Sequence, residues 1–340
     1  MKKAAHIDDV QPLTVDEHLE LLLKDESEID VKSTTATPDD LPDWYNEKLF
    51  KIGQKFYQNN MMQMISSSFV GLLAVIVIPQ TLKVLLFTKQ SSIPCIASAR
   101  YIRTALHIRN IYTCDPSDPN SKWYKTIDLI RWKHKTSSKR AKKAGIGGIY
   151  NRDVAITQFA FIGYAFVAPK SVGLQCTEEE CEALNHFWRV MGHMLEVPDR
   201  LNICRKTVAE TRELCRKLCY DVLAEHFNKA PIEFYEMVRV IINSLWYIDV
   251  TLNYDAFLAF TYQLHGIKYK APLGWYSRLN GKYHDLIYYL CCVPYVGAAV
   301  RTFFNYWLNF IFWLIQNYPL HAWMKFGINN FEIKLYPKYK

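Results

Sequence analysis

Apolar positions along most of the chain recur with the period of an α-helix. In the segment 177–198, a hydroxyl followed three residues later by a carboxylate forms a capping box, and Pro198 closes the segment. The apolar residues that share one face of this predicted helix are Leu184, Phe187, Met191 and Leu195. Residues 204–225 and 231–248 repeat the helical period, and no run shows sustained alternation of apolar and polar residues. The pattern predicts an all-α fold.

One stretch without charged residues, 56–82, contains the apolar run 69–78 and then Pro79. It is long enough to cross a bilayer, but its first half consists largely of Gln, Asn, Met and Ser. We therefore favour a pair of buried core helices that is broken at Pro79.

A second uncharged stretch, 302–324, is rich in tryptophan and tyrosine, as membrane-interface segments are. Its polar residues Asn305, Asn309 and Gln316 are costly in lipid unless they are paired. The stretch predicts a hydrophobic, membrane-associated helix, and a helix lying in the interface or buried in the protein remains open.

Charge divides the chain unevenly. Residues 1–43 hold twelve acids against four lysines, a net charge of −8, so residues 44–340 carry +16 within a total of +8. We expect an acidic flexible leader over 1–43, a helical domain over 44–325 and a basic tail over 326–340. A body this basic favours an anionic surface. Because no zinc-finger spacing or ribonucleoprotein motif is present, we expect a lipid membrane as partner and no nucleic acid.

Nine cysteines occur at irregular spacing, and no signal peptide is recognisable at the start. We expect reduced thiols in a cytosol-facing protein. None of the cysteines forms the Cys-x-x-Cys-His pattern of covalently attached haem. A zinc site built from Cys176, Cys181, His186 and His193 would match no standard spacing.

Arg100, Arg103 and Thr104 lie at positions i, i+3 and i+4 of a predicted helix and therefore share one face. No acid occurs between Glu47 and Asp115, so the two guanidinium groups have no carboxylate nearby in the sequence. Such a face fits a ligand with two carboxylates, or it is a solvated basic surface.

His134 lies in a strongly basic stretch, from Arg131 to Lys143. Neighbouring positive charge favours neutral imidazole, which is the form that binds a metal. A lone histidine in a basic helix is also commonly a surface residue, so this position by itself decides little.

Two more motifs follow in order: Asn-x-Asp-x-x-x-Thr-x-x-x-Phe over 151–161, and Trp-Arg-x-x-Gly over 188–192. Together with Arg100–Thr104 and His134, they resemble the catalytic-domain family shared by bacterial rubber oxygenase (latex-clearing protein) and the fungal endoplasmic-reticulum-bound oxygenase mpaB. The resemblance extends over about 45–305.

This resemblance implies a globin-like helical bundle enclosing non-covalent haem b. It makes His134 the iron ligand, places Arg100 and Thr104 at the cofactor, and makes Arg103 and Thr104 the candidate catalytic residues. It implies a haem-dependent oxygenase that uses dioxygen to cleave carbon–carbon double bonds of an isoprenoid or other lipid substrate, at the endoplasmic-reticulum membrane.

Two departures from the family pattern bear on the reaction. Arg103 replaces a lysine that can cap the iron, and a guanidinium has no free lone pair with which to do so. The glutamate taken as the family's catalytic base falls near Val84, in the acid-free stretch. The alternative function is therefore a membrane-associated haem-binding, or haem-free, protein of the same fold without turnover. A carboxylate-bridged di-iron bundle is disfavoured, because neither Glu182 nor Glu225 has a histidine three residues later.

Overall fold

Helices and the loops between them form the architecture of the protein. The computed structural model describes residues 6–30, 35–91, 93–246, 249–328, 331 and 333–336. No β-strand occurs in these ranges, where the β-type pairing is an isolated bridge between Glu28 and Tyr150. The predicted all-α class is confirmed.

The α-helices are, in chain order, α1 (Ile7–Val10), α2 (Val15–Lys24), α3 (Glu47–Asn59), α4 (Met61–Ile76), α5 (Pro79–Thr88), α6 (Pro94–Thr113), α7 (Lys122–Lys143), α8 (Asn151–Thr157), α9 (Phe159–Val167), α10 (Glu178–Met194), α11 (Val208–Lys217), α12 (Ala224–Asn228), α13 (Ile232–Leu245), α14 (Tyr254–Leu264), α15 (Trp275–Cys292), α16 (Val296–Asn317) and α17 (Leu320–Phe326). Short 3-10 segments are η1 (Pro38–Asp40), η2 (Pro169–Val172) and η3 (Asp199–Leu201), and η4 (Leu218–Leu223) is a π-helical segment.

Local sequence signals explain where several of these helices begin. At α10, Thr177 Oγ1 accepts from the Glu180 amide at 3.2 Å, and a Glu180 carboxylate oxygen accepts from the Thr177 amide at 2.9 Å, which confirms the predicted capping box. The helix ends at Met194, before the expected Pro198, because Glu196 takes a left-handed backbone conformation with φ 60°.

The start of α8 is tied to a segment that is distant in the sequence. The helix begins at Asn151 itself, after Tyr150, and has no side-chain cap. The Asn151 amide donates instead to Ser27 Oγ at 2.9 Å, so it ties α8 to the segment that follows α2.

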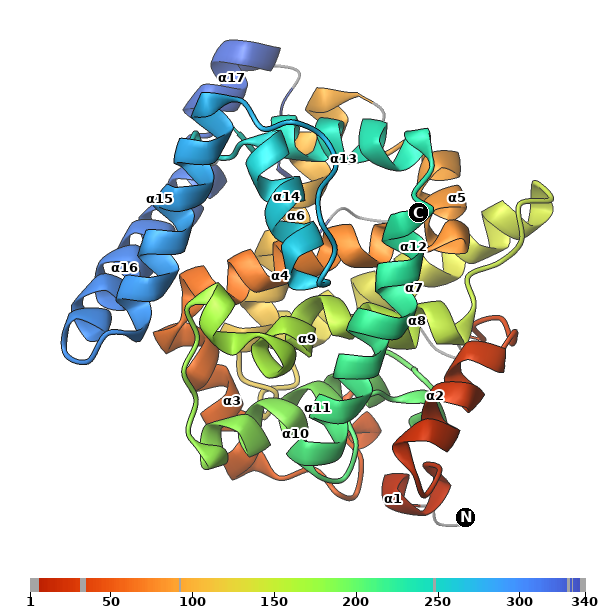
Figure 1. The fold of residues 1–340 in the computed structure, drawn as a ribbon. Helices are drawn as coiled ribbons and strands as arrows, with labels where there is room; N and C mark the ends of the chain where they lie inside the picture. Colours follow the sequence, from red (N-terminus) through yellow and green to blue (C-terminus); the bar gives the residue numbers. More distant parts are fainter. Residues whose placement is uncertain are drawn as a thin grey trace.

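The helix α4 forms the centre of the core. Figure 1 shows it crossing the middle of the molecule, with α9 on one side and α14 on the other. Met64, Val70 and Leu73 are completely buried, and α5 starts at Pro79. The expected pair of core helices broken at Pro79 is therefore confirmed.

The uncharged stretch 302–324 is not one helix. The helix α16 ends at Asn317 and α17 begins at Leu320, because Pro319 has no backbone donor and the preceding Tyr318 leaves the helical conformation, with φ −143° and ψ 76°. Within the described ranges, no individual helix has both the length and the apolar character needed to cross a membrane. The pairs α3–α4 and α15–α16 satisfy length and composition only when each pair is taken together, with bends of 93° and 119°.

Part of the acidic segment 1–43 is folded against the body of the protein. Ile7 in α1 and Leu22 in α2 are completely buried, and Arg189 of α10 pairs with Asp8. The region 326–340, expected to be a basic tail, also contributes packed residues: Phe331 is buried, and the Tyr336 hydroxyl accepts from the Asn110 amide at 2.8 Å. The segments at both ends therefore help to build the tertiary structure.

The sequence analysis predicted that the cysteines are reduced thiols, and for two of them the structure differs. Cys176 and Cys181 form a disulfide at the start of α10, with their Cα atoms 5.9 Å apart. Cys204, Cys215 and Cys219 are thiols that are buried in the core.

Candidate functional site

One face of α6 carries the arginines singled out from the sequence. Arg100 is half-buried and donates to Ser91 Oγ at 3.0 Å, and half-buried Arg103 donates through Nε to the Ala99 carbonyl at 3.0 Å. Thr104 is exposed, and its hydroxyl donates to the Arg100 carbonyl at 3.1 Å. One turn further along the same face, His107 is buried.

The neighbouring helix α7 presents Lys133 and His134. Both side chains have solvent-exposed surface. Protein atoms nevertheless surround them closely, and this desolvation is the largest cause of the lowered pKa of each group. Burial, followed by the charge of Lys133, lowers the pKa of His134 to about 4. Its imidazole is therefore neutral at pH 7, with a lone pair available.

Lys133 connects the two helices electrostatically. Burial and then the charges of Arg103 and Arg100 lower its pKa to about 8, so the three cations lie within range of one another. Among the described residues, neither Arg100 nor Lys133 forms an ion pair. We call Arg100, Arg103, His107, Lys133 and His134 the α6–α7 cluster. Its positive charge suits an anionic group.

His107 adds an unsatisfied polar group to this cluster. Both of its ring nitrogens are buried without a hydrogen-bond partner. Burial and then the charges of Lys133 and Arg103 lower its pKa to about 4. His107 and Lys133 are not among the residues selected from the sequence motifs. The α6 periodicity could have pointed to His107, whereas Lys133 is recognised only from the packing of α6 against α7.

Comparison with solved structures identifies a protein of similar architecture. The structure of latex clearing protein in its closed state matches with a TM-score of 0.52 and 16% sequence identity, covering 80% of this chain and 76% of that one. The chain shares that protein's fold. No family model matches the chain, and no curated protein matches it.

The position near which the sequence resemblance places the family's catalytic glutamate is apolar. Val84 lies on α5, which packs against α7, and it is buried. Val84 carries no carboxylate, so a proton acceptor near this position would have to come from another residue.

The remaining motif residues serve the packing of α9 and α10. The Gln158 amide donates to the Trp188 carbonyl at 3.1 Å and to Asn202 Oδ1 at 3.2 Å. A Cβ on Gly192 would lie 2.4 and 2.5 Å from the amide nitrogens of Gln158 and Asn202, so a larger residue would displace these hydrogen-bonded side chains. Phe161 stacks on Trp188 with ring centroids 4.5 Å apart. These residues support the fold and are not part of the α6–α7 cluster.

A cavity of about 250 Å³ lies elsewhere, between α14 and α15, and its lining includes Phe257, Phe260, Arg278 and Tyr288. No residue of the α6–α7 cluster lines it. Within the described ranges, no three His, Cys, Asp or Glu side chains come together in a way that could hold a metal ion.

Proposed function

We propose that this protein is a haem-dependent oxygenase that cleaves carbon–carbon double bonds of an isoprenoid or other lipid substrate with dioxygen. The observation that carries the proposal is the α6–α7 cluster, where a neutral His134 lies next to Lys133 on α7, and neither Lys133 nor Arg100 forms an ion pair among the described residues. The shared fold with latex clearing protein and the four ordered motifs support it.

Haem b fits the chemistry of these residues. A neutral His134 imidazole can donate its lone pair to iron, which needs only one protein ligand because the porphyrin supplies four. Arg100, Arg103 and Lys133 can hold the two propionates through charge-assisted hydrogen bonds. Bound haem would supply the iron that activates dioxygen.

The residues of this chain would then set the conditions for the reaction. Arg103 would stay protonated and act as a hydrogen-bond donor, either to a propionate or to dioxygen, because a guanidinium has no free lone pair with which to bind a metal. Thr104 offers a hydroxyl on the same face of α6. The buried Val84 favours the alternative, haem binding without turnover, because it provides no group to accept a proton.

Haem titration tests the ligand assignment. We expect His134→Ala to lose stoichiometric haem, seen as loss of the intense haem absorption band, while circular dichroism keeps its helical signal. The matched control is His107→Ala, which removes the other buried imidazole of the cluster and should retain haem. Full haem occupancy in His134→Ala, with loss in His107→Ala, would transfer the ligand role to His107.

Turnover separates the oxygenase from the non-catalytic alternative. Haem-loaded protein should consume dioxygen in the presence of a polyisoprene or farnesyl-chain substrate and release carbonyl products. Bound haem with no oxygen uptake on these substrates would support the alternative.

We also propose that the protein associates with the membrane of the endoplasmic reticulum. The basic body of the chain and the uncharged stretch 302–324 support a lipid partner, and no nucleic-acid motif points elsewhere.

A further inference from the structure

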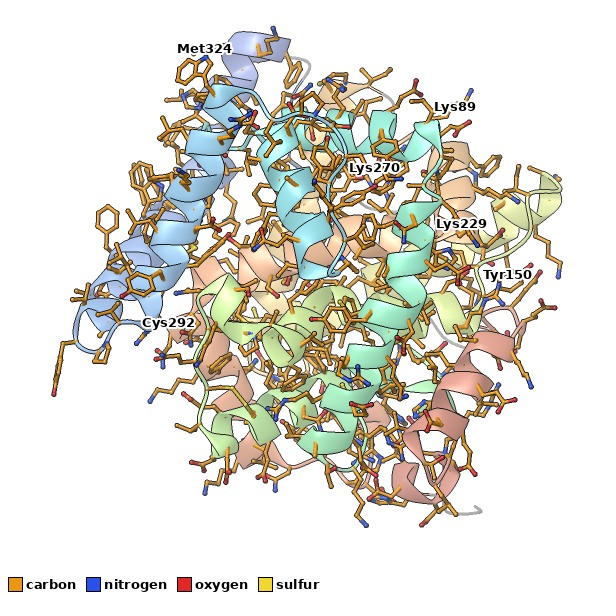
Figure 2. All side chains as sticks on the ribbon, in the orientation of Figure 1. Lys89, Tyr150, Lys229, Lys270, Cys292 and Met324 are labelled. Carbon is orange, nitrogen blue, oxygen red and sulfur yellow. A yellow bond between two sulfur atoms is a disulfide. The ribbon has the colours of Figure 1, made fainter. Side chains whose placement is uncertain are left out.

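The helices α15 and α16 form a hairpin along one edge of the molecule (Figure 1). On α15, large apolar side chains are exposed at intervals of three or four residues, so they form one stripe: Trp275, Leu279, Tyr283, Leu286 and Tyr289. Cys292 and Met324 lie near opposite ends of this edge (Figure 2). Exposed aromatic groups in such a row are uncommon on a surface that faces only water.

The second helix repeats the arrangement. Its exposed stripe consists of Phe303, Tyr306, Trp307, Phe310 and Trp313. Because α15 packs against α14, and α16 packs against α3 and α4, both stripes lie on the outward side. We call these two stripes together the hairpin face.

Two asparagines of α16, Asn305 and Asn309, point toward the protein. The Asn305 amide donates to the Asn59 carbonyl at 2.8 Å, and its oxygen accepts from the Met61 amide at 3.0 Å. Asn309 Oδ1 accepts from an Arg109 guanidinium at 3.2 Å. A helix on a water-facing surface has the opposite arrangement, with polar residues outward. Unpaired asparagines are costly in lipid, but these two side chains are paired within the protein, so they do not oppose contact of α16 with lipid.

The tip of the hairpin is also apolar. Residues 286–300 contain no charged side chain. Tyr295 is 96% exposed in a left-handed backbone conformation, with φ 64°, between Pro294 and Val296. The loop thus presents an exposed aromatic side chain.

Charge on the hairpin and α17 identifies the kind of partner. From 275 to 326 the cations are Arg278, Lys282, Arg301 and Lys325, against the single acid Asp285. A second copy of this chain, joined through the same face, would bring like charges together. An anionic lipid bilayer offers the complementary charge, and its interface is where tryptophan and tyrosine side chains are favoured.

We propose that the hairpin face docks on an anionic lipid bilayer, with the aromatic stripes in the headgroup region and Arg278 and Lys282 at the lipid phosphates. The inference rests on the membrane association proposed above and names its surface and lipid chemistry. It makes no use of the haem site, so the two can fail separately.

Vesicle flotation tests the proposal with the full chain. Protein diluted from detergent should float with vesicles of phosphatidylcholine and phosphatidylserine. The triple substitution Trp307→Ser, Phe310→Ser, Trp313→Ser should weaken this binding at least ten-fold. The matched control is Leu13→Ser with Ile232→Ser, which removes apolar side chains that are 89% and 65% exposed outside the hairpin, and it should bind as the unaltered protein does.

Two further measurements test the contribution of charge to vesicle binding and the depth of the tryptophan side chains in the bilayer. Arg278→Glu with Lys282→Glu should reduce binding to anionic vesicles at least ten-fold, and added salt should weaken binding of the unaltered protein. Lipids brominated near the headgroup should quench the tryptophan fluorescence of the unaltered protein, a result that needs no variant to fold.

Three results would overturn the proposal. These are binding by the triple variant equal to that of the control, no flotation of the unaltered protein, or a stable dimer in solution that the triple variant dissociates while vesicle binding is absent. A haem-loaded protein that fails to float would reject the hairpin face and leave the haem assignment standing.

Discussion

Burial keeps histidines in several elements of this protein uncharged near neutral pH. The pKa is lowered to about 4, with desolvation as the largest cause, for His18, His107, His134, His186 and His265. The proposed role of His134 as an iron ligand requires this neutral form, because only a neutral imidazole can bind iron. For the others the consequence concerns stability.

His265 illustrates the effect on stability. It is almost completely buried, donates or accepts at the Tyr164 hydroxyl at 3.3 Å, and has a folded pKa of about 4 against 6.5 when exposed. Because the folded pKa is the lower one, stability is highest above pH 6.5 and is lost as the pH falls from 6.5 toward 4. One such group should reduce the unfolding free energy by about 2 kcal/mol between pH 7.5 and 5.

Urea unfolding at the two pH values measures this contribution. His265→Phe should lose less stability than the unaltered protein between pH 7.5 and 5, whatever its stability at pH 7.5. Equal losses in the two proteins would show that His265 does not carry the effect.

At the scale of elements, close helix contacts depend on single glycines. The helices α4 and α9 approach at Gly71, where a Cβ would lie 2.3 Å from the Ala160 carbonyl oxygen and 2.5 Å from its Cα. These are backbone atoms, so they cannot move aside as a flexible side chain can. The contact lies at the centre of the core, and it fixes how closely these two helices pack.

Gly71→Ala should therefore destabilise the protein by about 3 kcal/mol, since the helices must separate. Gly281→Ala is the control: Gly281 is also in a helix, but a Cβ there meets nothing within 4 Å. The control should be neutral or stabilise by up to about 1 kcal/mol. Denaturation midpoints compare the two, and similar midpoints would contradict the close packing.

At the scale of the whole molecule, the N-terminal helices are held by a residue distant in the sequence. Arg205 is buried, and one of its guanidinium nitrogens lies 2.9 Å from His18 Nδ1. Another donates to the carbonyls of Pro12 and Leu13 at 2.9 and 3.1 Å. This contact joins α2 to the segment that precedes α11, so the folded body includes residues from the acidic N-terminal segment.

Arg205→Met should leave these groups unpaired and cost about 3 kcal/mol. It should also speed tryptic cleavage near Lys24, because α2 would detach more often. Arg216→Met, which removes an exposed arginine paired with Glu213, should change stability by less than about 1 kcal/mol. If both variants were cleaved at the rate of the unaltered protein, the anchoring role of Arg205 would be rejected.

The sequence by itself determined the local features. The capping box at Thr177, the break at Pro79 and the helical class follow from interactions within a few residues, which short-range patterns record. The ordered motifs from Arg100 to Gly192 led to the rubber-oxygenase resemblance, and the shared fold agrees with it. The ligand and catalytic roles of His134, Arg103 and Thr104 stay predictions.

Tertiary structure decided which distant residues meet. Lys133 faces Arg100 and Arg103 because α6 packs against α7, and no periodicity in either helix encodes that pairing. Asn305 turns inward because the α3–α4 junction offers backbone groups to bind, which leaves the aromatic side of α16 outside. Helix formation depends on neighbours along the chain, whereas burial and charge depend on neighbours in space, and only the folded structure supplies those.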